Sequence, residues 1–395
     1  MTSDWVSLFR SETLKYGMPS TRAVVVGLLC AFVATRNGRQ LAAHVIFKNI
    51  QKLLLHLPLK TRCAIVRKIF LMPFLKGRAA MARATRVYGY QWNWVVPVKK
   101  DGEWSGHWVM ENAYQYPKGW VEETAHQADL VIYYIHGGGF RLGHSLMYIN
   151  SFINILKRLK KKHGISARIF AVDYRMVPEF TYPTPGEDCM AAYSYLVNDL
   201  SINPRRIIIG GDSAGGNLTA TTLLHLLDHS RVDSVISLGS STRLPLPVPA
   251  GAVMISPWVT LENTSPTYKS KAATDCIPYE LLASPVDWYV PELAKLAGVQ
   301  HEALLKNPDV SPLYGNFEGL CPVLVTYGGA EVFSHDIENF INRLQRDHVQ
   351  VDVITRPDCP HDWIIEPFLS PTADIWLGGL NQLTDWCAAT IEKRN

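Results

Sequence analysis

The chain has 395 residues, enough to bury a large core, and its 47% hydrophobic content with 27 glycines and 24 prolines excludes a disordered or fibrous protein. Its seven cysteines are scattered, odd in number and without Cys-x-x-Cys spacing. This usage indicates a reducing intracellular setting, either the cytoplasm or the surface of an internal membrane such as the endoplasmic reticulum. We expect no metal and no cofactor.

The charge of the chain is unevenly distributed. Residues 1–100 hold 17 Lys and Arg against two acids, whereas residues 101–395 hold 22 against 33. The apolar run at 23–35 has 13 residues, whereas about 20 are needed to cross a bilayer as a helix. It also lies too far into the chain for a signal peptide. Apolar residues then recur at helical spacing at 46–57 and 65–70.

These patterns predict a basic amphipathic helical segment over residues 1–88. Two interpretations remain open. The helices pack on the rest of the protein as a cap over its pocket, or residues 1–80 contact an anionic membrane surface and load an apolar substrate. No nucleic-acid partner is expected, and the sequence leaves the oligomeric state open.

Strands alternate with helices in the rest of the chain. Strand-like alternation at 89–110 with a turn at 100–102 predicts a hairpin. Further strands are predicted near 130–135, 169–173, 207–209, 252–256, 322–327 and 349–355, with helices near 147–162 and 185–198. This order is typical of an α/β fold with a mostly parallel central sheet and helices on both faces. We expect this domain to span 89–395, with an irregular cap insertion at about 259–321.

A strand, a sharp turn and a helix follow one another at 207–218. At the turn Ser213 lies within Gly-Asp-Ser-Ala-Gly at 211–215, a G-x-S-x-G arrangement. The glycines two before and two after the serine leave room where a Cβ would collide with the neighbouring strand or helix. The pattern predicts a nucleophile elbow, which exposes the serine hydroxyl to a substrate.

A second glycine-rich turn, His-Gly-Gly-Gly-Phe at 136–140, follows the strand at 130–135. A dinucleotide-binding G-x-G-x-x-G is excluded because Leu142 stands where its last glycine would be. Such a loop lets backbone N–H groups approach a ligand closely. In a serine hydrolase these donors, together with the amide of Ala214, bind the oxyanion of the tetrahedral intermediate. The alternative is a tight loop with no role in binding.

A serine nucleophile needs a histidine to take its proton and a carboxylate to orient that histidine. When the serine lies on an elbow, the acid follows a late strand and the histidine follows the last one. Glu331 and His361 occupy these positions. Asp336 is the alternative acid, because aspartate is the more usual residue type. The histidines at 225 and 229 have the spacing of a metal pair but no third ligand near them in sequence.

Together these residues resemble the hormone-sensitive lipase family of the α/β-hydrolases. The likeness covers about residues 128–395 and depends on the motifs His-Gly-Gly-Gly at 136–139, Asp-Tyr-Arg at 173–175 with Pro-Glu at 178–179, Gly-Asp-Ser-Ala-Gly-Gly-Asn at 211–217, and Ser-Pro-Trp at 256–258. The resemblance implies an α/β-hydrolase catalytic domain with a helical cap. The roles that it implies are nucleophile for Ser213, triad acid for Glu331, base for His361, and oxyanion donors for Gly137, Gly138 and Ala214.

The chain departs from this family at the acid. The usual residue is aspartate in an Asp-Pro-Leu turn, and the matching turn here is Glu331-Val332-Phe333. Asp336 therefore stays an alternative for the triad acid. The resemblance is looser in the basic N-terminal region, which is similar to that of fungal members, including steryl acetyl hydrolases and hydrolases of natural-product pathways. The candidates for contact with a substrate are Phe140, Trp258, Trp288 and Tyr289.

The resulting expectation is a serine carboxylesterase. It would remove a short acyl group, such as acetyl, from a bulky lipophilic alcohol such as a sterol, terpenoid or polyketide, through an acyl-enzyme on Ser213. Acyl transfer to a second alcohol, or lactone formation, uses the same three residues and is the alternative. A binding scaffold without catalysis is a third hypothesis.

Overall fold

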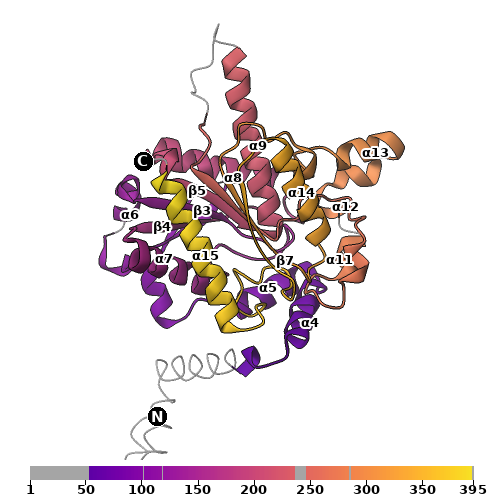
Figure 1. Ribbon diagram of the computed structural model, residues 1–395, viewed down its shortest axis with the longest axis horizontal. Helices are drawn as coiled ribbons and strands as arrows, with labels where there is room; N and C mark the ends of the chain where they lie inside the picture. Colours follow the sequence, from indigo (N-terminus) through magenta and orange to yellow (C-terminus); the bar gives the residue numbers. More distant parts are fainter. Residues whose placement is uncertain (1–52, 101, 118, 236–245, 284–285, 394–395) are drawn as a thin grey trace, which may run out of the picture. The chain divides into compact units, whose positions relative to one another are not determined.

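The structure is a computed structural model that describes residues 53–100, 102–117, 119–235, 246–283 and 286–393 (Figure 1). The chain divides into a unit of residues 1–57 and a unit of residues 58–395. The second unit includes the helices at 59–70 and 74–84, so the division lies nearer the N-terminus than the expected boundary at 88. The apolar run at 23–35 and the helical pattern at 46–52 lie outside the described residues. In the part that is described, no helix is both long and apolar enough to span a bilayer.

An eight-stranded sheet forms the centre of the second unit. Its strands are β1 (Val95–Lys99), β2 (Ser105–Val109), β3 (Leu130–Ile135), β4 (Ala167–Asp173), β5 (Ile207–Asp212), β6 (Gly251–Ile255), β7 (Val323–Gly328) and β8 (Val351–Arg356). They lie in the order β1-β2-β4-β3-β5-β6-β7-β8. Strand β2 is antiparallel to both of its neighbours, and the pairs from β4 to β8 are parallel. The mostly parallel sheet predicted from the sequence is confirmed.

The central strands are buried along their whole length. Every residue of β3, β5, β6 and β7 is buried, whereas β8, at the edge, is half-buried or exposed. A parallel strand covered on both faces needs a continuous apolar run rather than an alternating one. The three consecutive isoleucines at 207–209 meet this requirement.

Helices cover both faces of the sheet (Figure 1). The long helices are α7 (Ile149–His163), α8 (Thr184–Ser194), α9 (Ser213–Val235), α14 (Ser334–Arg346) and α15 (Ala373–Glu392). The chain moves from β3 to β4 in one direction along the sheet and from β5 to β6 and β7 to β8 in the other. Because such crossovers are right-handed, α7 lies on the face opposite α9 and α14. Helix α15 packs against α7, and α8 packs against α9.

Short elements fill the connections. The insertion between β6 and β7 contains α10 (Thr267–Ser270), α11 (Tyr279–Ala283), α12 (Val286–Tyr289) and α13 (Gly298–Leu305), and α6 (Trp120–Glu123) precedes β3. Turns of 3₁₀ helix lie at 89–94, 113–115, 125–127, 204–206, 291–295 and 312–314, and one π-helical turn at 195–199 extends α8. The region near 259–321, expected to be irregular with short helices, contains these short helices joined by irregular segments among the described residues.

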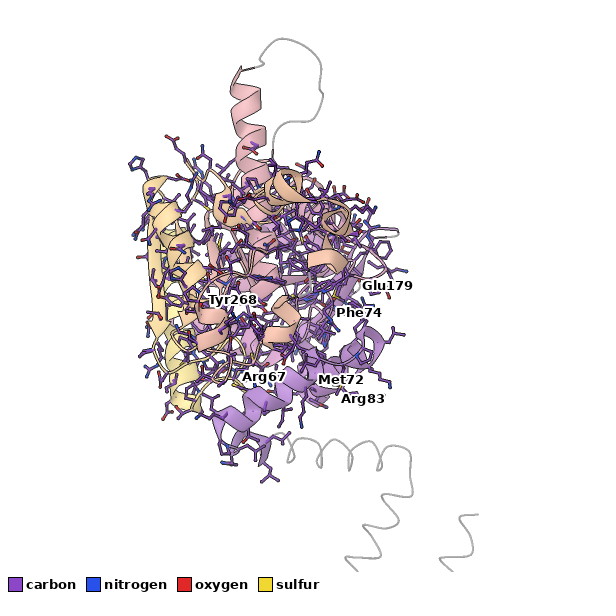
Figure 2. The ribbon with its side chains drawn as sticks, turned by 90° about the vertical axis from the view of Figure 1, so that its right-hand side faces the viewer. Arg67, Met72, Phe74, Arg83, Glu179 and Tyr268 are labelled. Carbon is purple, nitrogen blue, oxygen red and sulfur yellow. The ribbon has the colours of Figure 1, made fainter. Side chains whose placement is uncertain are left out.

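Two helices precede the sheet, α4 (Leu59–Phe70) and α5 (Phe74–Ala84) (Figure 2). Each follows a proline, at 58 and 73, whose fixed φ suits the start of a helix. The buried Arg62 guanidinium of α4 donates to the carbonyls of Phe368 and Ser370, both at 2.9 Å. Arg78 of α5 forms a bidentate ion pair with Glu179, at 2.8 and 3.0 Å. Arginines thus fix both helices to loops at distant positions of the chain.

Two neighbouring glycines on α15 differ in the space that is available for a side chain. A Cβ at Gly378 would have no atom within 4 Å, whereas one at Gly379 would lie 2.8 Å from Trp363 and Ile364. Replacing glycine by alanine within a helix gains about 1 kcal/mol, and overpacking costs about 1–3 kcal/mol. We expect Gly378→Ala to raise the free energy of unfolding and Gly379→Ala to lower it in urea denaturation followed by circular dichroism. Equal effects would contradict the packing of α15 on the loop after β8.

Candidate active site

The turn between β5 and α9 has the geometry of a nucleophile elbow. Ser213 has a φ of 52°, in the left-handed region. A Cβ on Gly215 would lie 2.1 Å from the carbonyl oxygen of Ile135, and one on Gly211 would lie 2.5 Å from the same oxygen. Real Cβ contacts are never so short, so only glycine fits at these two positions. The strand end, the serine and the start of the helix are therefore held in a tight bend.

The glycine loop after β3 lies against this elbow. Gly138 and Gly139 have φ values of 110° and 63°, which glycine adopts without strain. The amide of Gly137 donates to Oδ1 of Asp212 at 3.0 Å. This N–H is therefore already paired with a carboxylate, which corrects the expectation that Gly137 is an oxyanion donor.

Two of the three expected oxyanion donors are left for a ligand. The amide of Gly138 donates to no acceptor among the described residues. Ala214 belongs to the first turn of α9, where amides have no acceptor within the helix. Backbone donors in this arrangement are able to bind an anion that forms above the serine.

Asp212 fixes the glycine loop to the elbow. Its carboxylate is fully buried and accepts hydrogen bonds from the hydroxyls of Tyr134, at 2.8 Å, and Tyr148, at 2.7 Å, in addition to the amide of Gly137. Burial raises the pKa of Asp212, and these three donors act in the opposite direction by stabilising the charged form. Asp212, which directly precedes Ser213, therefore stabilises the structure of the site.

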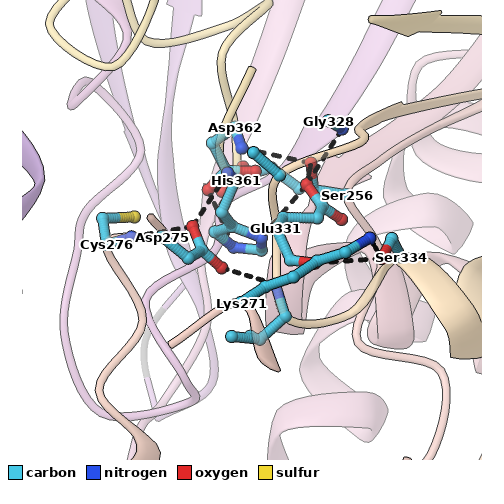
Figure 3. A network of polar contacts seen from close by, with 12 residues as sticks. Ser256, Lys271, Asp275, Cys276, Gly328, Glu331, Ser334, His361 and Asp362 are labelled. Carbon is cyan, nitrogen blue, oxygen red and sulfur yellow. Dashed lines mark hydrogen bonds and ion pairs between the residues drawn. The ribbon is translucent and has the colours of Figure 1, made fainter. Parts of the chain in front are cut away.

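Glu331 and His361 lie side by side in the turns after β7 and β8 (Figure 3). The distance from Oε2 of Glu331 to Nδ1 of His361 is 3.8 Å. The same Oε2 accepts from the hydroxyl of Ser256 at 2.7 Å and from the amide of Gly328 at 3.1 Å. Oε1 has no hydrogen-bond partner among the described residues. The carboxylate is thus held by one oxygen, next to the imidazole.

The His361 ring is almost fully buried, with 2% of its surface exposed. Burial lowers the pKa of His361 to about 3, so the imidazole is neutral near pH 7. A neutral imidazole is the form that accepts a proton from a hydroxyl. Burial and the charge of Asp275 raise the pKa of Glu331 well above its usual range. The ring of Phe333 packs edge-on against the imidazole of His361, with 5.2 Å between the two ring centres.

Asp336, the alternative acid, has different partners. It lies in the first turn of α14 and accepts from the hydroxyl of Tyr268 at 2.9 Å and from that of Ser265. Both donors belong to the insertion between β6 and β7. Asp336 therefore ties the insertion to α14, and the geometry favours Glu331 as the partner of His361.

A second acid contacts the histidine, and no sequence motif pointed to it. Asp362 has a φ of 58°, and its Oδ2 lies 3.2 Å from Nε2 of His361. Its amide donates to Ser256 Oγ at 3.1 Å. Burial and the charge of Asp212 raise the pKa of Asp362. The only signal in the sequence is its position directly after the histidine. The bond to Ser256 joins the histidine turn to the segment after β6, whose Trp258 amide donates to the carbonyl of Ser213 at 3.0 Å.

Three of the four aromatic residues expected at a substrate site form one row. Tyr289 stacks on Phe140 at 3.8 Å with parallel rings, and Trp258 lies 5.8 Å from Phe140. Trp258 in turn stacks on Phe333 at 5.7 Å, next to the histidine. The row joins α12, the glycine loop after β3 and the turns that carry Glu331 and His361. Its residues are almost fully buried.

Trp288, the fourth of them, lies elsewhere. Its ring meets Phe74 of α5 edge-on at 6.2 Å, and the Arg141 guanidinium lies 5.9 Å from its centre. Trp288 therefore links the insertion to the N-terminal helices. A cavity of about 770 Å³ is lined by Tyr289, by Tyr182 and, on α9, by Leu218. Ser213 and His361 do not line it.

Comparison with known proteins agrees with this architecture. A model of the alpha/beta hydrolase fold family matches residues 106–365. The chain belongs to this family. The solved structure of an esterase from the bacterial hormone-sensitive lipase family superposes with a TM-score of 0.64 at 24% identity, over 84% of this chain and 98% of that one. A hormone-sensitive lipase from a metagenome library gives the same TM-score, over 85% and 99%. At this identity the likeness concerns the fold.

Curated relatives are similar over the same region. An acetyl-hydrolase of Streptomyces hygroscopicus is 28% identical over 246 residues, which cover 62% of this chain and 71% of that protein. A Schizosaccharomyces pombe protein provisionally named a steryl acetyl hydrolase is 26% identical over 223 residues, 55% of each chain. The predicted resemblance to hormone-sensitive lipases and acetyl hydrolases is therefore confirmed.

The two candidate acids are separable by a matched pair of variants. Glu331→Gln keeps the shape of the side chain and removes the charge that orients His361, for which the loss in a comparable triad is about 10⁴-fold. We expect it to slow the labelling of Ser213 by a fluorophosphonate at least about 100-fold. Asp336→Asn should change this labelling rate by less than about threefold, because Asp336 bonds to the insertion rather than to His361. The reverse order would make Asp336 the acid.

Proposed function

We propose that the protein is a serine carboxylesterase in which Ser213 is the nucleophile, His361 the base and Glu331 the triad acid. The supporting observation is the convergence of three turns. The segment after β6 accepts from the amide of Asp362 through Ser256, at 3.1 Å, and donates to the carbonyl of Ser213 through Trp258, at 3.0 Å. Glu331 lies 3.8 Å from the imidazole. Membership in the alpha/beta hydrolase fold family is consistent with this chemistry. The fold alone would not establish an activity.

The reaction follows from these positions. Ser213 Oγ attacks the ester carbonyl carbon while Nε2 of His361 takes the hydroxyl proton, and the amides of Gly138 and Ala214 bind the oxyanion. The carbonyl re-forms as the alcohol leaves with that proton, which gives an acyl-enzyme. Water then attacks the acyl carbon, His361 again takes and returns a proton, and the carboxylic acid and free serine are released.

Small movements complete the catalytic arrangement. The 3.8 Å between Nδ1 of His361 and Oε2 of Glu331 exceeds a hydrogen bond by about 1 Å, and such contacts commonly tighten when a substrate binds. Nε2 faces Asp362 at 3.2 Å. A ring shift toward Glu331 would form the Nδ1–H bond and withdraw Nε2 from Asp362. The imidazole then has one nitrogen for the acid and the other for the serine.

The substrate in this proposal is a short-chain ester, such as an acetyl ester, of a bulky lipophilic alcohol of the sterol, terpenoid or polyketide kind. The apolar row from Tyr289 to Phe333 supports it, because it makes the surroundings of the proposed catalytic turns apolar. The names of the relatives, an acetyl-hydrolase and a steryl acetyl hydrolase, point to the same class. The elbow is closely surrounded, with Ser213 only 4% exposed, which favours a small acyl group.

A series of p-nitrophenyl esters tests this substrate class. We expect kcat/KM for acetate or butyrate to exceed that for octanoate by at least about tenfold, the scale set by a few methylenes in an apolar pocket. Ser213→Ala should reduce turnover to the uncatalysed rate. A steryl acetate should compete better than ethyl acetate. Turnover that increases with acyl length, or that persists in Ser213→Ala, would contradict the proposal.

The N-terminal helices support a second part of the proposal, contact with an anionic membrane surface. Between residues 13 and 100 the chain has no Asp or Glu. At the corner between α4 and α5, Leu71 and Leu75 are 50% and 72% exposed, and Lys68 and Lys76 are exposed beside them in sequence. Exposed apolar side chains with basic neighbours are typical of segments that bind at the lipid interface.

Vesicle flotation of the full chain tests this contact. We expect binding to vesicles that contain phosphatidylserine and little binding to phosphatidylcholine alone. Lys68→Glu with Lys76→Glu should weaken binding at least about tenfold, since each lysine near the surface contributes about 1 kcal/mol. Lys161→Glu, on the exposed face of α7, is the matched control. If the control variant loses as much vesicle binding as the double variant, the corner has no specific role. Equal binding to vesicles with and without phosphatidylserine would also contradict the proposal.

A further inference from the structure

The segment after α10 lies against the turn that carries Glu331. Lys271 Nζ donates to Ser334 Oγ at 2.6 Å, and Thr274 Oγ1 donates to the carbonyl of Ala330 at 2.9 Å. The insertion between β6 and β7 thus holds this turn on both sides of the acid. Neither contact reaches the histidine turn.

Asp275, in the same segment, bonds to both catalytic turns (Figure 3). Its carboxyl is fully buried. Oδ1 accepts from the amide of His361 at 3.0 Å and from that of Cys276 at 2.7 Å, and Oδ2 accepts from the amide of Val332 at 2.8 Å. Val332 directly follows Glu331. A single carboxyl group therefore spans the backbone of the proposed acid turn and the backbone of the proposed base.

We propose that Asp275 is a positioning residue, whose ionised carboxylate sets the distance between Glu331 and His361. This inference depends on the esterase activity proposed above. Asp275 touches neither the serine nor the ester, so it acts only through the two turns. The 3.8 Å between the acid and the imidazole has to close by about 1 Å, and misplacement on this scale is able to cost about 100-fold in rate.

The chemistry of the three bonds requires a carboxylate at this position. All three partners are N–H donors, so both oxygens must accept. A protonated carboxyl would direct its own O–H at an amide hydrogen, and an asparagine would direct its NH₂ at one. Protonation or replacement by asparagine therefore breaks the bond of Asp275 either to the turn of Glu331 or to that of His361. Burial raises the pKa of Asp275 to about 6, although the amides of Val332, His361 and Cys276 favour the charged form.

Charged and titratable groups face Asp275 from each neighbouring element. Helix α4 contributes Arg67, which donates to the carbonyls of Asp275 and Ala272, and the thiol of Cys63. The strand ends contribute Glu331, His361 and Asp362. The positive charge of Arg67 lowers the pKa of Asp275. As pH rises through about 6 the carboxyl ionises, both turns are held, and kcat is expected to rise.

The test compares Asp275→Asn with Thr274→Val in the full chain, with p-nitrophenyl acetate as the substrate. We expect Asp275→Asn to lower kcat about 100-fold at pH 7.5 with KM changed less than about threefold, because a positioning role affects the reacting geometry. Thr274→Val removes the neighbouring bond to Ala330 and keeps the carboxylate, so its kcat should stay within about threefold. Labelling of Ser213 to one equivalent and circular dichroism report whether each variant is folded.

The pH profile separates this role from simple support of the fold. In the wild type, kcat should fall on the acid side with an apparent pKa near the value of about 6 given by Asp275. This limb should disappear in Asp275→Asn. Arg67→Met leaves the carboxylate in place and removes the nearby cation, so the limb should move to higher pH. This second variant keeps the test decisive if Asp275→Asn does not fold.

The possible failures have different signatures. A folded wild type without esterase turnover contradicts the proposed function. An active wild type whose kcat and pH profile are reproduced by Asp275→Asn contradicts the positioning role. An acid limb that is unmoved in Arg67→Met contradicts its assignment to Asp275. Equal losses in Thr274→Val and Asp275→Asn would show that the whole segment, rather than the carboxylate, supports the turns.

Discussion

The site depends on the close approach of two pieces of backbone. A Cβ at position 215 would lie 2.1 Å from the carbonyl oxygen of Ile135 and 2.6 Å from that of His136. Because hydrogen is the only substituent that fits, the start of α9 packs directly on the end of β3. The same contact sets the glycine loop beside Ser213, so one steric constraint places the proposed nucleophile and its amide donors together.

Buried carboxyl groups do most of the remaining positioning. Asp212 holds the glycine loop, Glu331 and Asp362 lie beside the imidazole, and Asp275 spans the turns that carry Glu331 and His361. Asp212, Glu331 and Asp275 each accept hydrogen bonds. Buried charges of one sign are costly unless donors surround them. Backbone amides and hydroxyls supply these donors, whereas the neutral form of His361 follows from the burial of its own ring.

The sequence predicted those features that depend on local pattern. Apolar runs marked the strands, and the spacing of glycines around Ser213 marked the elbow, because each follows from the period of a strand or the sterics of a turn. Chain order then pointed to His361 as the base and to Glu331, in the turn after β7, as the acid; both roles are part of the proposal. The different surroundings of Glu331 and Asp336 could not be read from the sequence, since both follow the same strand and only their partners differ.

Other features could not be read from the sequence, because they depend on contacts between distant positions. The amide of Gly137 is taken by Asp212, 75 positions away, and no glycine motif reveals which N–H is already bonded. Asp275 lies 86 positions before His361 and 57 before Val332, in a segment without a motif. Trp288 was expected at the substrate, yet it packs on Phe74 of α5, since aromatic residues serve cores and pockets equally well.

The central claim is that the hydroxyl of Ser213 is activated by the imidazole of His361. The most direct measurement is mass-spectrometric mapping of the adduct formed with a fluorophosphonate, on the wild type and on His361→Ala. The account predicts one adduct per chain, located on Ser213 and formed far more slowly without the histidine. A folded protein that forms no adduct, an adduct on another residue, or equal rates for the two proteins would contradict it.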